Sequence, residues 1–144
     1  MHMLSWTALI RRIRTILTEH DTPPVELLIG TYTLAWGLFV LSHVDTFGSA
    51  TAYQPLLRIA PEGVWGAGIA ALGMVQLAAV LGQRQRCRIY SMLAGAGLWL
   101  WLAIATGLGS EFRSAGFVHF TLIAFWSGWS YWRIPRPRRR RCTK

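Results

Sequence analysis

Few side chains in this sequence could carry out chemistry, and they form no catalytic set. The two histidines that fall in apolar stretches are His43 and His119. Two imidazoles at equal depth on facing helices could ligate a haem iron, whereas a zinc site needs further ligands. At 1.5 Å per residue, the depths of these histidines differ by roughly 7 Å. We expect neither a metal nor a cofactor, with a haem or metal at His43 and His119 as the minor alternative.

Gln76 is the most deeply placed strongly polar side chain, and we expect it to hydrogen-bond across helices or, alternatively, to line a polar pore. The sequence has no Gly-rich phosphate loop, no HExxH and no serine-nucleophile motif. No acid lies in the middle of an apolar stretch, which argues against a proton-coupled antiporter. Cys87 and Cys142 form no CxxC pair. We therefore expect no catalytic residue and no enzyme.

The elements that must position these side chains are four apolar stretches, at residues 25–44, 63–82, 89–108 and 114–131. Each has the length of a helix that crosses a bilayer. Within them Glu26 is the one charged residue, and 53% of the 144 residues are hydrophobic against 15% charged. Helices without a polar stripe do not suit a soluble fold. The sequence predicts an all-α integral membrane protein, a four-helix bundle over residues 23–133.

The cations divide by segment. Of the 15 Lys and Arg residues, 13 lie before the first stretch, between the second and third, or after the fourth. Short cytoplasmic segments collect Lys and Arg because these residues resist translocation. The pattern predicts that both termini are cytoplasmic. The great excess of Arg over Lys hints at a GC-rich bacterial or phage genome, so we expect the bacterial inner membrane.

Two flanking segments are predicted to bind the membrane surface. Residues 1–22 contain Trp6, Leu9 and Ile13 on one helical face, with arginines on the other, which is typical of an amphipathic interfacial helix. Residues 134–144 form a basic tail. Cations beside a span find anionic lipid headgroups, so we expect anionic lipids and no specific nucleic acid as partners. The expected headgroup-binding residues are Arg11, Arg12, Arg14, Arg84, Arg86, Arg88, Arg138, Arg139, Arg140 and Arg141.

Small residues recur at three- and four-residue steps inside the stretches. Such residues let membrane helices approach closely, so they predict helix–helix contacts. They are most frequent in the second stretch, which we expect to lie centrally. The predicted packing residues are Gly63, Gly66, Ala67, Ala70, Ala71, Gly95 and Gly128.

Three functional hypotheses follow from this organisation. The first is an accessory or anchor subunit of a membrane or phage-encoded complex, docking through small-residue faces and a ridge of Trp126, Trp129 and Trp132. The second rests on a resemblance: in small size, short loops and a basic tail, the chain resembles phage holins, which implies self-assembly and membrane permeabilisation. The third is a compact redox or lipid- or quinone-binding protein using His43 and His119. We expect a homo-oligomer or a complex subunit.

Overall fold

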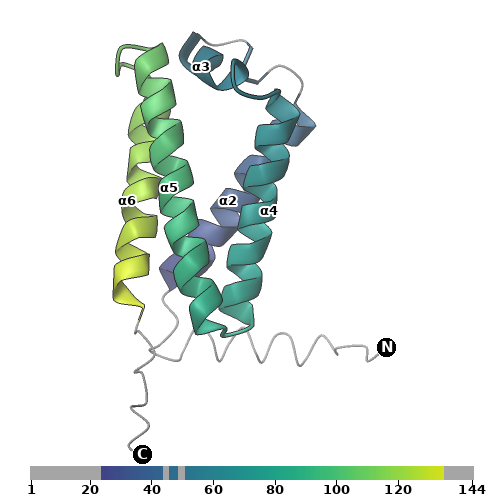
Figure 1. Ribbon diagram of the computed structural model, residues 1–144, viewed down its shortest axis with the longest axis vertical. Coiled ribbons are helices and arrows are strands. Elements are labelled where there is room, and N and C mark those ends of the chain that lie inside the picture. Colours follow the sequence, from purple (N-terminus) through teal and green to yellow (C-terminus); the bar gives the residue numbers. More distant parts are fainter. Residues whose placement is uncertain (1–23, 44–45, 49–50, 135–144) are drawn as a thin grey trace, which may run out of the picture.

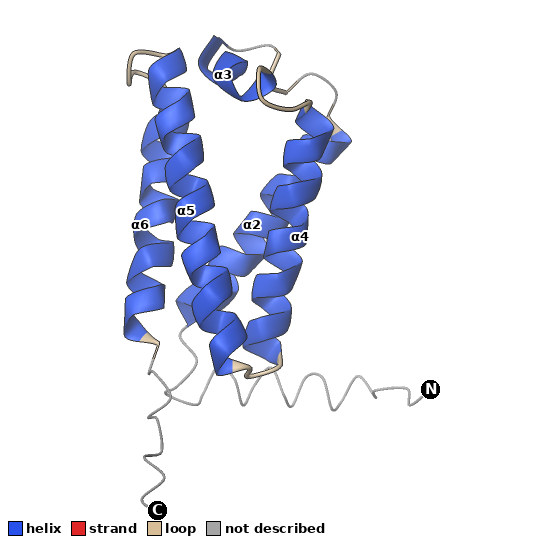
Figure 2. Cartoon of the chain, in the orientation of Figure 1, coloured by secondary structure: helices blue, strands red, loops and turns tan. Residues whose placement is uncertain are grey.

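The computed structural model describes residues 24–43, 46–48 and 51–134. The described chain folds as α2 (Pro24–Ser42), the 3-10 turn η1 (Thr51–Tyr53), α3 (Gln54–Leu57), α4 (Glu62–Leu81), α5 (Gln85–Gly109) and α6 (Ala115–Arg133) (Figure 1). These ranges contain helices and loops and no strand (Figure 2). The predicted all-α class is confirmed. The interfacial helix predicted over residues 1–22 and the tail beyond Ile134 lie outside the described residues.

The four long helices run alternately up and down, so α2 begins and α6 ends at the same end of the molecule (Figure 1). They associate mainly as two pairs, α2 with α4 and α5 with α6, and the contacts between the pairs are sparser. The short helices η1 and α3 lie at the opposite end (Figure 1). This arrangement brings the first turns of α2 and α5 to one end, although Glu26 and Arg88 within them are 62 residues apart in the chain.

Three of the long helices are apolar and long enough to cross a membrane. Their mean hydropathies are 1.5 for α2, 1.9 for α4 and 1.6 for α5, so the structure indicates an integral membrane protein. Helix α6 has 19 residues, as many as α2, but does not reach this hydropathy, because it carries His, Thr, Ser and Trp side chains. The fourth predicted span is therefore a helix whose composition differs from that of the other three.

The connection between α4 and α5 is shorter than the sequence indicates. Helix α4 ends at Leu81 and α5 begins at Gln85, leaving only residues 82–84 to turn the chain. Gln83 makes the reversal with a φ of 51°, and the amide of Arg84 donates to the Ala79 carbonyl over 3.1 Å. Arg86 and Arg88, which lie between the second and third predicted stretches, consequently belong to the first turn of α5.

Helices α2 and α4 approach closely because glycines face the opposite backbone. A Cβ added to Gly37 would lie 2.3 Å from the amide nitrogen of Ala70, and one added to Gly73 would lie 2.4 Å from that of Leu34. A Cβ added to Gly66 would lie 2.9 Å from Leu41 Cγ and 3.1 Å from a Val40 methyl group on α2. The two helices therefore meet main chain to main chain, which is how small residues hold membrane helices together.

The predicted packing residues consequently divide into two groups. Gly66, Ala70 and Gly95 are buried at helix contacts. The prediction did not include Gly37 and Gly73. Each of these glycines packs against one residue of the facing helix, and nothing near it in the sequence identifies that residue. The remaining predicted positions are exposed or half-buried: Gly63, Ala67, Ala71 and Gly128.

An apolar core fills the end that carries η1 and α3. It contains Phe47, Leu56, Trp99, Leu102 and Phe120. The carbonyl of Leu56 accepts a 3.1 Å hydrogen bond from the Trp65 indole, which ties α3 to α4.

Candidate functional site

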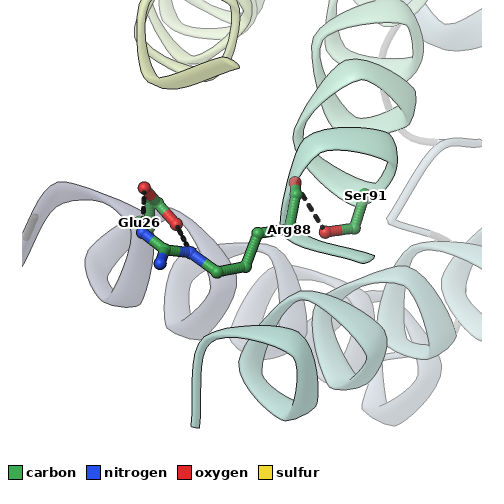
Figure 3. A network of polar contacts seen from close by, with 3 residues as sticks. All are labelled: Glu26, Arg88 and Ser91. Carbon is green, nitrogen blue, oxygen red and sulfur yellow. Dashed lines mark hydrogen bonds and ion pairs between the residues drawn. The ribbon is translucent and has the colours of Figure 1, made fainter. Parts of the chain in front are cut away.

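The most strongly charged interior site joins the first turns of α2 and α5. Arg88 donates to Glu26 through Nε to Oε2 over 2.8 Å and through a terminal nitrogen to Oε1 over 2.9 Å (Figure 3). The Glu26 residue is 0% exposed and Arg88 is 7% exposed. Ser91 Oγ, one turn along α5, donates to the Arg88 carbonyl. The carboxylate and the guanidinium thus compensate one another in two parallel hydrogen bonds, the strongest pairing geometry that these groups adopt.

The ion pair divides the three arginines between the second and third predicted stretches, all of which we expected to bind lipid headgroups. Arg84 and Arg86 are exposed, as a headgroup ligand must be. Arg88 lies close to them in the sequence but points into the protein. Because α5 already begins at Gln85, Arg88 belongs to its first turn and faces Glu26. Arg11, Arg12, Arg14 and the arginines from Arg138 to Arg141 lie outside the described residues.

A signal for this pair exists in the sequence. Glu26 is the one formal charge in the first apolar stretch, and charges within spans usually find a partner. As an acid in the first turn of α2, it also lies at the positive end of the helix dipole. Nothing local in the sequence selects Arg88 from the cations near the same end.

A second polar site lies between α4, α5 and α6. Gln76 Nε2 donates across to the Ser91 carbonyl of α5 over 3.2 Å. Its Oε1 and the hydroxyl of Ser127 on α6 are both buried and lack a hydrogen-bond partner among the described residues. Gly95 lies between them, since a Cβ there would be 2.4 Å from Gln76 Nε2 and 3.9 Å from Ser127 Oγ. Gln76 therefore links α4 to α5 through an interhelical hydrogen bond.

Gly95 should therefore be sensitive to a single added methyl group. We expect Gly95→Ala to destabilise the folded protein by about 1–3 kcal/mol, because the methyl group displaces the buried Gln76 amide from its hydrogen bond to the Ser91 carbonyl. Gly97→Ala, on the same helix, adds its methyl to open space and should be neutral or slightly stabilising. Unfolding by SDS in mixed micelles measures both changes. Equal stabilities for the two variants would contradict this view of the site.

An aromatic cluster packs beside His119, which is itself exposed. The Tyr32 hydroxyl is hydrogen-bonded to His119 Nε2, and the rings of Trp36 and Phe120 lie 6.3 and 5.8 Å from the imidazole. Trp99 packs against Tyr32, and its indole donates to Thr33 Oγ1 over 3.4 Å. The cluster joins α2, α5 and α6 by ring contacts and short-range polar contacts.

His43 takes no part in that cluster. Its Nδ1 is within hydrogen-bond distance of the Ser42 hydroxyl and the Phe39 carbonyl, and its ring lies 4.3 Å from that of Phe39. The two histidines therefore have separate partners. Among residues 24–43, 46–48 and 51–134, no three His, Cys, Asp or Glu side chains are grouped so that they could hold a metal ion.

Two grooves flank α6. One runs between α2 and α6 with a volume of about 430 Å³, and the other between α5 and α6 with about 470 Å³. Between them α6 exposes aromatic side chains, including Trp129 at 41% and Trp132 at 71%. The lining residues are Val25, Leu28, Ile29, Tyr32, Ile123 and Trp126 for the first groove, and Leu93, Ala96, Gly97, Leu100, Thr121, Ala124 and Phe125 for the second.

Comparisons of the chain with protein-family models, with curated proteins and with solved structures found no match.

Proposed function

We propose that this chain is an inner-membrane protein with four spans that acts, without catalysis of its own, as an accessory or anchor subunit of a larger membrane complex. The observation that carries the proposal is the groove between α5 and α6. Gly97 lies in it with nothing within 4 Å of the position of an added Cβ. The groove thus offers small side chains at its base and open space above them, which is the surface that a further transmembrane helix needs.

The composition of α6 supports a protein partner beside it. This helix runs antiparallel to α5 and packs along it, so we take it as the fourth span. Its exposed side includes Trp126, Trp129 and Trp132, whereas neither α2 nor α4 exposes a tryptophan. An indole N–H gains more from hydrogen-bonding protein than from lying against hydrocarbon.

Two glycines allow a matched test of the docking groove. Gly97→Leu fills the groove, while Gly68→Leu adds the same side chain to α4, where a Cβ also meets open space. We expect the wild type and Gly68→Leu to co-purify with the same partner in constant stoichiometry from host membranes, and Gly97→Leu to lose it. Both variants should keep the wild-type thermal midpoint. Equal recovery of the partner with the two variants, or no stoichiometric partner at all, would refute the proposal.

The orientation in the membrane can be tested independently. With both termini cytoplasmic, alkaline phosphatase fused after Lys144 should be inactive, because this enzyme needs an oxidising compartment to form its disulfides. The same enzyme inserted between α2 and α4, after Gly48, should be active. The pattern follows from the concentration of cations at the end where α2 begins and α6 ends. The reverse pattern of activity would invert the orientation.

The alternative functions predict different results in simple assays. A holin-like protein should stop growth abruptly when expression is induced and should release a cytoplasmic dye. A haem-binding protein should show a Soret band after purification. The accessory-subunit proposal predicts neither result, so either observation would replace it.

A further inference from the structure

The groove between α2 and α6 offers a second surface, distinct from the α5–α6 groove that the proposed function uses. Its volume of about 430 Å³ falls within the range of small-molecule sites. Leu28 and Trp126 line it while 70% and 46% exposed, so the groove is open to the surroundings of the protein. We propose that it holds one acyl chain of an anionic phospholipid, whose headgroup lies at the end where α2 begins.

The chemistry of the lining calls for hydrocarbon. The walls are aliphatic and aromatic, and the Tyr32 hydroxyl is already hydrogen-bonded to His119. From Val25, the second residue of α2, to Tyr32 the groove follows the helix for about 10 Å at 1.5 Å per residue. The groove therefore starts at one end of the helix and follows it inward, as the upper part of an acyl chain does below its headgroup.

The charges at this end favour an anion over a zwitterion. The end of α6 lies beside the start of α2, since Ile134 and Ile29 belong to one apolar cluster. Arg133 immediately precedes Ile134 and is exposed, and so are Arg84 and Arg86 at the start of α5, which lies at the same end. Glu26, the acid closest in sequence to Val25, has its charge compensated by Arg88. A phosphate at this end thus meets an excess of positive charge.

The test is native mass spectrometry of the full-length protein, titrated in micelles with phosphatidylglycerol or phosphatidylcholine of the same acyl chains. We expect the first phosphatidylglycerol to bind about tenfold more tightly than phosphatidylcholine. Leu28→Trp, which narrows the groove, should weaken phosphatidylglycerol binding by about tenfold. Leu38→Trp, at another exposed position of α2 outside the groove, is the matched control and should bind as the wild type does.

Two further measurements separate the contribution of the acyl chain to binding from that of the headgroup. Arg133→Gln should reduce the preference for phosphatidylglycerol and leave phosphatidylcholine binding unchanged. Lysophosphatidylglycerol, with a single acyl chain, should compete, and glycerol phosphate should not. Ile123→Phe narrows the opposite wall and replaces Leu28→Trp if that variant does not fold. If the groove variants bind phosphatidylglycerol as tightly as Leu38→Trp does, the lipid is annular only. If a quinone co-purifies with the wild type and is lost in Leu28→Trp, the groove belongs to another ligand. Either outcome would overturn the proposal.

Discussion

Replacing Arg88 with methionine should lower the free energy of unfolding by about 3–5 kcal/mol, since it leaves the buried Glu26 carboxylate without its counter-charge. Both side chains are almost inaccessible, so neither water nor a headgroup can take the place of the missing partner. Arg88→Lys should recover only part of the loss, because an ammonium group cannot make the two parallel hydrogen bonds of the guanidinium. SDS-induced unfolding in mixed micelles, followed by tryptophan fluorescence, measures the effect.

Two controls test whether the loss of stability comes from the ion pair itself. Arg86→Met removes an exposed arginine from the same helical turn and should change the stability by less than about 0.5 kcal/mol. The double variant Glu26→Leu/Arg88→Met removes both charges and should be more stable than Arg88→Met alone, because apolar residues often replace a buried ion pair without loss. A double variant no better than the single one would show that the destabilisation comes from lost packing rather than from an unpaired charge.

Replacing Gly37 with alanine should destabilise the protein by about 1–3 kcal/mol, although alanine is the better helix former. The added methyl group would lie 2.3 Å from the amide nitrogen of Ala70, and a main-chain atom cannot move aside as a flexible side chain can. Helices α2 and α4 must therefore separate to admit it. Gly73→Ala, at 2.4 Å from the Leu34 nitrogen, tests the same crossing from α4 and should have a similar effect.

Gly68→Ala is the matched control for this crossing. It makes the same substitution within α4, but its methyl group meets no atom within 4 Å. It should be neutral or stabilising by up to about 1 kcal/mol through helix propensity. The double variant Gly37→Ala/Gly73→Ala should lose less than the sum of the single losses, because one separation of the helices relieves both contacts. Equal stabilities of Gly37→Ala and Gly68→Ala would contradict the close approach.

Local patterns in the sequence were sufficient to locate the four long helices, although not the start of α5. The predicted stretch 63–82 corresponds to α4 within one residue at each end, since Pro61 and Gly82 mark its limits and apolar residues fill the span between them. Gln76 could likewise be expected to reach across to another helix, since a lone amide in an apolar helix must satisfy its hydrogen bonds. Both inferences use only residues close together in the chain.

Tertiary structure decided which residues meet. Glu26 and Arg88 pair because α2 and α5 both begin at the same end, and Gly37 meets Ala70 because of the angle and register at which two helices cross. His43 and His119 share a residue type and similar surroundings in the sequence, yet only His119 reaches Tyr32. The periodicity of a helix fixes which face each side chain occupies, but not which helix that face turns towards. That choice depends on packing between segments far apart in the chain, and it created both the buried ion pair and the grooves beside α6.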